Sequence, residues 1–362
     1  MAVDIENTTE EARFVKQARN FDIQRVIVKI GSSLLTNNGR GLDRTAIYEW
    51  AKQIAKLHKQ GVEVLLVSSG AVAEGVVRMN LDERPRKLAA LQACASIGQM
   101  GLIETWWSAL IQHGIQSSQL LLTHDDLSNR SRYLNTTGAL TQLLEWRVLP
   151  VINENDTITI DEIKFGDNDT LGAMAAAMVN ADLYIILTDQ EGVFTDNPRN
   201  NPNAKMIRQE RAMADYLFDI AGDGGKLGRG GMLTKIRAGR LAAMGGCPTV
   251  IVSGAIDDVI TRVVSGEAVG TLLTTNDEDK IIARKQWLAV GVVEVRGDFD
   301  EGDVVEIVHQ DTGERIAVGQ VNFSSRDACR VARERTEQFD RILGNNEERV
   351  VMVHRDNLAL TM

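Results

Sequence analysis

The chain has 362 residues, a hydrophobic content of 44% and a formal net charge of −10 at neutral pH. This length exceeds the size at which one hydrophobic core usually stops growing, so we expect one large domain and one smaller domain. The acidic excess argues against a general polyanion binder, because non-specific affinity for nucleic acids depends on basic residues that release condensed counterions. Small metabolites are the ligand class that suits this charge.

The cysteines and the N-terminal segment bear on the cellular compartment. Cys94, Cys247 and Cys329 are widely separated and lack the paired spacing of zinc and redox sites, so we interpret them as reduced core residues and expect no metal ion held by the protein alone. Residues 1–24 form a polar extension without the basic start and apolar run of a signal peptide. No stretch approaches the roughly 20 apolar residues that cross a bilayer. We expect a cytoplasmic protein without membrane contact.

Short apolar runs alternate with helical patterns over residues 25–276. This alternation is typical of a parallel sheet with helices on both faces. The predicted strands are Val26–Ile30, Val62–Val67, Ser118–Leu122, Val148–Ile152, Leu183–Leu187 and Thr249–Val252. Several are apolar throughout, as expected for strands that are covered on both sides. We therefore predict an α/β domain of three layers, α/β/α, with an open and mainly parallel sheet.

Two segments are predicted to be helices that cover this sheet. Asp43–Gln60 has apolar residues at helical spacing, with Asp43 as N-cap and Gly61 as the stop. Arg86–His113 is rich in small residues and apolar on more than one side, so we expect a helix that is buried on two faces. The sequence leaves open whether this helix forms a subunit interface or is internal.

The sequence pattern changes at the charged stretch Asp277–Lys285, after which strand-like apolar runs dominate. We place a linker at residues 277–289 and a small β-rich domain at residues 290–362, with turns at its Gly-Asp and Thr-Gly pairs. Its predicted strands are Val290–Val295, Asp303–Val308, Arg315–Val321 and Val350–His354.

The residues that directly follow the strands are candidates for ligand binding, because ligands of open α/β sheets bind beyond the carboxyl ends of the strands. Lys29 precedes Gly31 and Ser32, a turn whose backbone N–H groups can hold a phosphate together with the lysine. Ser69 and Gly70 follow the second strand and offer donors for a carboxylate. Each turn alone is weak evidence, since an exposed lysine or a tightly packed turn would give the same pattern.

The most specific signal is a pair of polar clusters, Asn153–Asp156 and Gly166–Asp169. Carboxylates can bind an ammonium group, while amides and helix N-terminal N–H groups bind a carboxylate, so the pair suits an amino-acid ligand. The alternative is a solvated acidic loop. A calcium loop is disfavoured because the glycine and glutamate spacing of an EF-hand is absent.

A fifth candidate combines Thr188 and Asp189 at a strand end with the glycine-rich segment Gly228–Lys235. Flexible glycines followed by a lysine suit a lid over nucleotide phosphates, although neither the P-loop nor the Rossmann pattern fits and a plain flexible loop remains the alternative. Together these five motifs at strand ends supply the lysines, glycine turns and polar pocket that γ-phosphoryl transfer requires. A carboxylate acceptor with a pKa of about 4.3 is already ionised and needs no general base, which explains why no histidine accompanies these motifs.

At this point the motifs resemble a known family, the bacterial glutamate 5-kinases of the amino-acid kinase family, which carry a C-terminal PUA module. The resemblance runs from about residue 25 to the C-terminus. The elements that carry it are Val-Lys-Ile-Gly-Ser-Ser, Val-Ser-Ser-Gly-Ala, Pro-Val-Ile-Asn-Glu-Asn-Asp, Gly-Asp-Asn-Asp, Leu-Thr-Asp-Gln-Glu-Gly and Gly-Gly-Met-Leu-Thr-Lys. It implies the amino-acid kinase fold with a PUA-like domain, and phosphorylation of L-glutamate by ATP with Mg²⁺ to L-glutamyl 5-phosphate, the first step of proline biosynthesis.

The resemblance also implies residue roles. Lys29 and Lys235 would neutralise the transferring phosphoryl group, and Asp167 and Asp169 would orient the lysines or the Mg²⁺ of the nucleotide. L-Glutamate would contact Ser69, Gly70, Asp156 and Asn168. ATP would contact Lys29, Gly31, Ser32, Thr188, Asp189, Arg229, Gly230, Gly231, Met232, Leu233, Thr234 and Lys235. A homo-oligomer, dimer or tetramer, and hand-over of the product to a glutamate-5-semialdehyde dehydrogenase are further implications.

The sequence departs from the family at two places. Arg229 stands where the lid of family members usually has threonine. In addition, Trp287 is followed almost directly by Val290, where family members carry a longer segment, so we expect the PUA-like domain to be truncated at its start, without its opening strand and helix.

Two alternatives remain beside a glutamate kinase. One is another amino-acid kinase, acting on acetylglutamate, aspartate or a nucleoside monophosphate, and the polar clusters speak against it. The other is a non-catalytic RNA-binding or regulatory protein. Residues 280–362 contain 12 Lys and Arg against 15 Asp and Glu, a difference of −3, whereas an RNA-binding surface is expected to be basic.

Overall fold

The computed structural model describes residues 23–36, 41–123, 126, 130–158, 168–198, 200–221, 231–275, 294–308, 315–321, 323–332, 342–343 and 353–360. The chain divides into two compact units, one of residues 1–122 and 140–280 and one of residues 123–139 and 281–362. Most of the predicted N-terminal extension therefore lies outside the described residues.

The first unit is built on an eight-stranded sheet with the order β3-β4-β2-β1-β5-β9-β10-β8, as far as the described residues show. Its strands are β1 (Arg25–Ile30), β2 (Glu63–Ser68), β3 (Ser117–Leu122), β4 (Leu149–Glu154), β5 (Leu183–Thr188), β8 (Gln209–Arg211), β9 (Thr249–Ser253) and β10 (Thr271–Thr274). All neighbouring strands pair in parallel except β9 and β10. The six predicted strands and the mainly parallel sheet are confirmed. The short strands β8 and β10 were not predicted, and neither were β6 (Val193–Phe194) and β7 (Met206–Ile207), which pair with each other.

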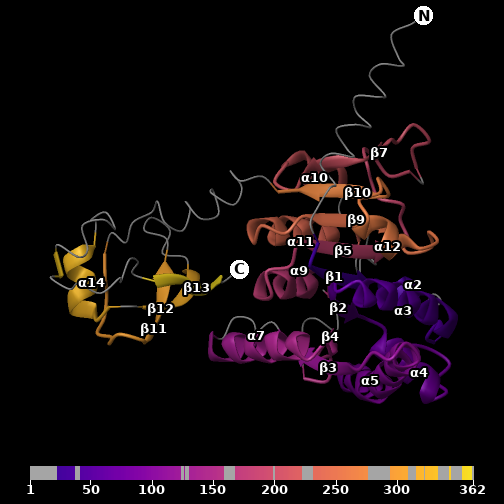
Figure 1. The fold of residues 1–362 in the computed structure, drawn as a ribbon, viewed down its shortest axis with the longest axis horizontal. Helices are drawn as coiled ribbons and strands as arrows, with labels where there is room; N and C mark the ends of the chain where they lie inside the picture. The colour runs from indigo at the N-terminus through magenta and orange to yellow at the C-terminus, as the bar shows by residue number, and fades with distance from the viewer. Residues whose placement is uncertain are drawn as a thin grey trace, which may run out of the picture. The chain divides into compact units, whose positions relative to one another are not determined.

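Helices cover both faces of this sheet, as the sequence predicts. They are α2 (Ser32–Leu35), α3 (Arg44–Lys59), α4 (Ala71–Arg78), α5 (Leu88–Ile111), α9 (Asn168–Met178), α10 (Tyr216–Ala221), α11 (Met232–Met244) and α12 (Val259–Val264), and a further helix, α7 (Arg130–Glu145), leads into β4. Figure 1 shows α9 and α11 on one face and α3 and α12 on the other. Successive strand residues point to opposite faces, so Val28 and Ile30 join the apolar cluster that contains Trp50 and Ile54 of α3.

Helix α3 begins and ends as its sequence predicts. The Asp43 side chain accepts a hydrogen bond of 3.0 Å from the backbone N–H of Ala46, and Gly61 follows the helix with a φ of +94°. The C-terminal carbonyls of α3 are capped by Arg147, whose guanidinium donates to the carbonyl oxygens of Gly61, at 3.0 Å, and His58.

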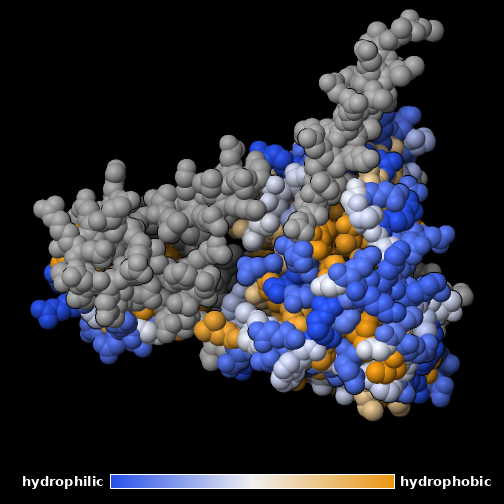
Figure 2. All heavy atoms as spheres, in the orientation of Figure 1, coloured by the Kyte–Doolittle hydropathy of each residue, from blue (hydrophilic) through white to orange (hydrophobic). Residues whose placement is uncertain are grey.

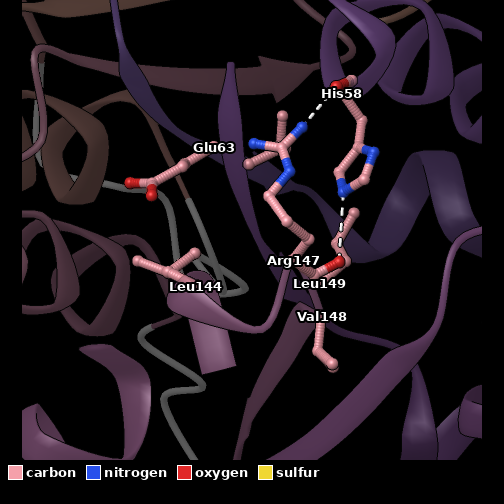
Figure 3. Close-up of a pocket in the computed structure, with 7 residues that line it drawn as sticks. His58, Glu63, Leu144, Arg147, Val148 and Leu149 are labelled. Carbon is pink, nitrogen blue, oxygen red and sulfur yellow. Dashed lines mark hydrogen bonds between the residues drawn. The ribbon is translucent and has the colours of Figure 1, made fainter. Parts of the chain in front are cut away.

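In return, His58 Nε2 donates to the carbonyl oxygen of Arg147 over 3.1 Å (Figure 3). Burial of the imidazole lowers the pKa of His58 from its usual 6.5; the carbonyl bond opposes this shift and the nearby Arg147 charge adds to it. This reciprocal pair joins the end of α3 to the segment that leads into β4.

Helix α5 packs into two separate apolar clusters along its length, but the residues of both lie on one broad side, so the prediction that the helix is buried on two faces is wrong. Trp106 belongs to the main cluster and Cys94 to a smaller one with Val72 of α4. The opposite side is open, where the exposed fractions of Met100 and Trp107 are 71% and 47%.

Backbones of α4 and α5 touch where they cross. A Cβ added at Gly75 would lie 1.8 Å from the carbonyl oxygen of Cys94, and one added at Gly98 would lie 1.8 Å from that of Ala71. Only glycine fits at these two positions, so the small residues of α5 serve close helix packing.

The second unit contains an antiparallel three-stranded sheet, with β12 (Arg315–Val321) between β11 (Val304–Val308) and β13 (Val353–Leu360). Helix α14 (Ser325–Val331) follows β12, and its Ala328 and Val331 form a small core with Phe323. This arrangement confirms a β-rich C-terminal part. Of the predicted strand Val290–Val295, residues 294 and 295 are not in a strand, and residues 290–293 lie outside the described part.

The prediction that all three cysteines are core residues is wrong for one of them. Cys94 and Cys247 are buried, whereas Cys329 is exposed. Cys329 lies between the inward-facing Ala328 and Val331 of the amphipathic helix α14, so its side chain falls on the polar side.

The surface of the first unit is mainly hydrophilic, with smaller apolar areas between, on the face drawn in Figure 2. Within the described part of the chain, no helix has the length and apolar character required to cross a membrane.

Candidate active site

The candidate site lies where the order of strands reverses. Strand β1 is flanked by β2 on one side and by β5 on the other, and the chain builds the β2, β3 and β4 side first before it crosses to β5. The carboxyl ends of β1 and β5 meet there, and Gly31 N–H donates to the carbonyl oxygen of Leu187 over 3.0 Å. Such a reversal point is where open α/β sheets bind ligands.

Lys29 and Lys235 meet at this point on a single carboxylate. Lys29 Nζ, from β1, lies 2.5 Å from Asp169 Oδ1, and Lys235 Nζ, from the first turn of α11, lies 3.1 Å from Asp169 Oδ2. The exposed fractions of the three side chains are 6%, 4% and 2%. Thr234 Oγ1 also donates to Asp169 Oδ2 over 2.8 Å. Two cations therefore share one buried anion, and within this cluster positive charge is in excess.

Asp169 is ionised in this setting. Burial alone would raise the pKa of its carboxyl, but the ammonium groups of Lys235 and Lys29, with hydrogen bonds from Lys29 and Thr234, hold that pKa well below its usual range. The backbone of Asp169 is fixed as well, because the Tyr184 hydroxyl donates to its carbonyl oxygen over 2.8 Å. The carboxylate thus aims both lysines from a rigid position at the start of α9.

A second group of polar side chains forms a continuous hydrogen-bond chain that starts at the turn after β2. Asn168 Nδ2 donates to Ser69 Oγ over 2.7 Å and to Asn153 Oδ1 over 3.0 Å. Asn153 Nδ2 in turn donates to Gln99 Oε1 over 2.8 Å. The chain joins four elements: the β2–α4 turn, α9, β4 and α5.

Gly70 shapes the turn between Ser69 and α4. Its φ is +106°, in the left-handed region that favours glycine, and an added Cβ would lie 3.0 Å from Thr36 Cγ2. This conformation begins α4 directly after Ser69, so the free N–H groups of the first helical turn lie beside the Ser69 hydroxyl. Partial positive charge at that end favours an anion.

The structure places the remaining predicted residues as follows. Gly31 precedes α2 and Ser32 is its exposed first residue; Thr188 ends β5, and the exposed Asp189 carboxylate accepts a 3.2 Å hydrogen bond from the Thr188 hydroxyl. The segment Gly231–Thr234 forms the N-cap and first residues of α11. Asp156 is half-buried in the turn after β4. Asp167, Arg229 and Gly230 lie outside the described residues.

Two residues of the site's surroundings were not predicted. Gln99 ends the amide chain from the buried side of α5, and Trp106 Nε1 on the same helix donates to Ser68 Oγ over 2.9 Å. The available signal was a polar Gln inside a helix of mainly small and apolar residues, and its partners become visible only when the helix is placed against β4.

Comparison with known proteins identifies the family of the chain. The family model of the amino acid kinase family matches residues 24–253, and the PUA domain model matches residues 277–343. Among solved structures, a UMP kinase from Bacillus anthracis aligns with 70% of this chain and 97% of its own, with a TM-score of 0.47 and 16% identity.

Several curated relatives match along the whole chain. A glutamate 5-kinase from Psychrobacter arcticus is 90% identical over 390 aligned positions that cover 100% of both chains, and one from Acinetobacter baumannii is 54% identical over 95% of this chain and 98% of its own. The 390 positions exceed the 362 residues of this chain by 28, so the Psychrobacter protein has residues without a counterpart here. That they are the opening strand and helix of the PUA domain stays a prediction. The chain belongs to the amino acid kinase family and is a kinase with a C-terminal PUA domain.

Proposed function

We propose that the chain transfers the γ-phosphoryl group of ATP to the side-chain carboxylate of L-glutamate and forms L-glutamyl 5-phosphate, the first step of proline biosynthesis, in the cytoplasm. The observation that carries this proposal is the meeting of Lys29 and Lys235 on Asp169 at the reversal point of the sheet. The names of the full-length relatives support the acceptor.

The reaction needs positioning and charge neutralisation rather than a base. A glutamate side chain with a pKa of about 4.3 is already ionised at neutral pH, so its oxygen attacks the γ-phosphorus directly. As the bond to the leaving ADP breaks, charge spreads over the phosphoryl oxygens. Lys29 and Lys235 neutralise this charge from either side, and Asp169 holds their ammonium groups in place.

Glutamate is held by the turn after β2 and by the polar clusters. Ser69, Gly70 and the N-terminal N–H groups of α4 suit a carboxylate, because they combine a hydroxyl, backbone donors and the positive end of a helix. Asp156 supplies a carboxylate for the ammonium group. Asn168 bridges the two regions through its bond to Ser69.

ATP lies on the β5 and α11 side of the same edge. We assign its contacts to Lys29, Gly31, Ser32, Thr188, Asp189, and the segment from Arg229 to Lys235. Mg²⁺ bound to the phosphates would add further charge neutralisation, and the exposed carboxylate of Asp189 at the end of β5 fits its preference for oxygen ligands. Asp169 is engaged by both lysines, so we assign it to their orientation, and Asp167 to the same reacting centre.

The acceptor is tested by coupled ADP release with L-glutamate, acetylglutamate, aspartate and UMP as competing substrates. We expect L-glutamate to give the highest kcat/KM, and trapping of the product with hydroxylamine to yield the glutamyl hydroxamate. Faster turnover of aspartate or UMP would overturn the assignment. RNA binding that weakens with salt, together with no ATP turnover, would favour a regulatory protein instead.

The open side of α5 supports a homo-oligomer, either a dimer or a tetramer, with a second copy of this chain on the exposed Met100 and Trp107. Arg86 and Lys87 precede the helix and its last turn has no basic residue. In an antiparallel pair about a two-fold axis, these cations would lie near the partially negative end of the partner helix. Light scattering should give a lower mass for Trp107→Glu than for the unchanged chain, and an equal mass would contradict this surface.

The acyl phosphate product is labile, which suits its hand-over to a glutamate-5-semialdehyde dehydrogenase. Channelling assays would test this hand-over.

A further inference from the structure

We infer that Gln99 is a positioning residue for glutamate: through the amide of Asn153 it orients Asn168 so that the Asn168 carbonyl oxygen receives a hydrogen bond from the α-ammonium group of the substrate. This inference rests on the proposed function and names the residue, outside the substrate pocket, that sets the orientation of a pocket residue.

Among the described residues, Gln99 reaches the site through Asn153. It projects from the buried side of α5, with an exposed fraction of 9%, and its Oε1 accepts from Asn153 Nδ2 over 2.8 Å. Asn153 is 1% exposed and is the penultimate residue of β4. A buried amide that loses its acceptor leaves an N–H group unpaired, which costs more than a typical hydrogen bond contributes. Gln99 Nε2 is buried without a hydrogen-bond partner among the described residues, so the contact that orients Asn153 is the acceptor Oε1, which leaves Asn153 Oδ1 to point toward Asn168.

The direction of the chain decides what Asn168 offers. Because Asn153 donates to Gln99, its Oδ1 faces Asn168 and accepts from Asn168 Nδ2 over 3.0 Å. Asn168 Nδ2 also donates to Ser69 Oγ, so both of its N–H groups are used within the protein. The remaining Asn168 atom, Oδ1, is buried and has no hydrogen-bond partner among the described residues.

An acceptor without a partner at this position calls for a donor on the ligand. L-Glutamate at neutral pH carries one donor group, its α-ammonium group, while both of its carboxylates only accept. An Asn168 amide turned the other way would present N–H groups and would favour a carboxylate instead. The orientation imposed through Gln99 thus contributes to selection of an amino acid over a plain dicarboxylate.

The test compares Gln99→Met, which keeps the size of the side chain and removes the acceptor, with Gln99→Glu, which keeps an acceptor oxygen for Asn153. Each variant is assayed with L-glutamate and with glutarate, which lacks the ammonium group. Gln112→Met, at the exposed C-cap of the same helix, is the matched control. Melting temperatures of all variants identify any that fold poorly.

We expect Gln99→Met to raise the KM for L-glutamate about five- to tenfold, as loss of one oriented hydrogen bond predicts, with kcat little changed. Its KM for glutarate should stay the same, so the preference for glutamate over glutarate falls. Gln99→Glu should retain most of that preference. An equal rise in KM for both ligands, or no change in KM for either ligand, would overturn the inference even if the unchanged enzyme phosphorylates glutamate. No glutamate turnover in the unchanged enzyme would instead refute the proposed function.

Discussion

Lys29 and Lys235 come from distant parts of the chain, β1 and α11, and their ammonium groups contact opposite oxygens of the Asp169 carboxylate. That carboxylate offsets the repulsion between the two buried ammonium groups. The arrangement therefore couples the stability of the first unit to its chemistry.

Replacing Asp169 with asparagine should lower both stability and turnover. The change leaves the Lys29 and Lys235 ammonium groups facing a neutral amide, and breaking a buried ion pair by removing one partner typically costs about 3–5 kcal/mol. Urea denaturation should show a loss of this size in the free energy of unfolding, and kcat should fall strongly. Asp82→Asn, on the exposed segment before α5, is the control. A loss below about 1 kcal/mol, as for an exposed pair, would contradict the buried cluster.

Replacing Lys235 with alanine should reduce the rate with the fold retained. One charge-stabilising contact at a transition state is typically worth about 10²–10³ in kcat. Steady-state ADP release measures this loss, circular dichroism checks the fold, and the exposed Lys205→Ala serves for comparison. Activity near that of the unchanged chain would refute the role of Lys235 in phosphoryl transfer.

Asp156→Ala should act mainly through binding of glutamate. The half-buried carboxylate is proposed to face the ammonium group of the substrate and not the phosphoryl group, so the KM for glutamate should rise while the KM for ATP stays nearly constant. Initial rates over a grid of both substrates separate the two constants. If the KM for glutamate does not change, Asp156 does not hold the substrate.

The pair of His58 and Arg147 should make stability depend on pH. The folded pKa of His58 lies below its unfolded value of 6.5, so the folded state takes up a proton less readily than the unfolded chain. The contribution of the neutral imidazole is complete above that value and is lost as pH falls from it toward the lowered folded pKa.

His58→Gln keeps a donor for the Arg147 carbonyl oxygen and removes the titration. The drop in melting temperature between about pH 8 and about pH 5.5 should therefore be smaller in this variant than in the unchanged chain. His113→Gln, the same change at another histidine, is the control. A drop that is the same in all three proteins would show that His58 does not contribute.

The parts of the fold that repeat a simple pattern could be predicted from sequence. The strands that contain Val28, Leu66 and Ile185 are mainly apolar because both faces are covered, and the N-cap of α3 follows from Asp43. The strands β8 and β10 have three and four residues at one edge of the sheet, too short to show a period. The antiparallel pairing of β10 with β9 and the pairing of the edge strand β8 with β10 depend on tertiary contacts that no local sequence pattern encodes.

The candidate site could be predicted as a set of strand ends but not as a network. The motifs and the family resemblance predicted Lys29, Lys235 and Asp169 at one reacting centre, whereas their direct contact through a single carboxylate depends on how α9 and α11 pack against the sheet. Gln99 was missed because α5 is far from the motifs in sequence and its small residues suggested packing alone. Its function depends on an amide of β4 that only the folded chain brings near.

The touching backbones of α4 and α5 have a mechanical consequence. Gly75 and Gly98 leave no compressible side chain between the two helices, so a displacement of one helix is passed directly to the other. The Ser69 hydroxyl, which precedes α4, and the Gln99 amide, which projects from α5, are therefore kept at a constant distance from each other. The proposed glutamate site is thus preorganised before the substrate binds.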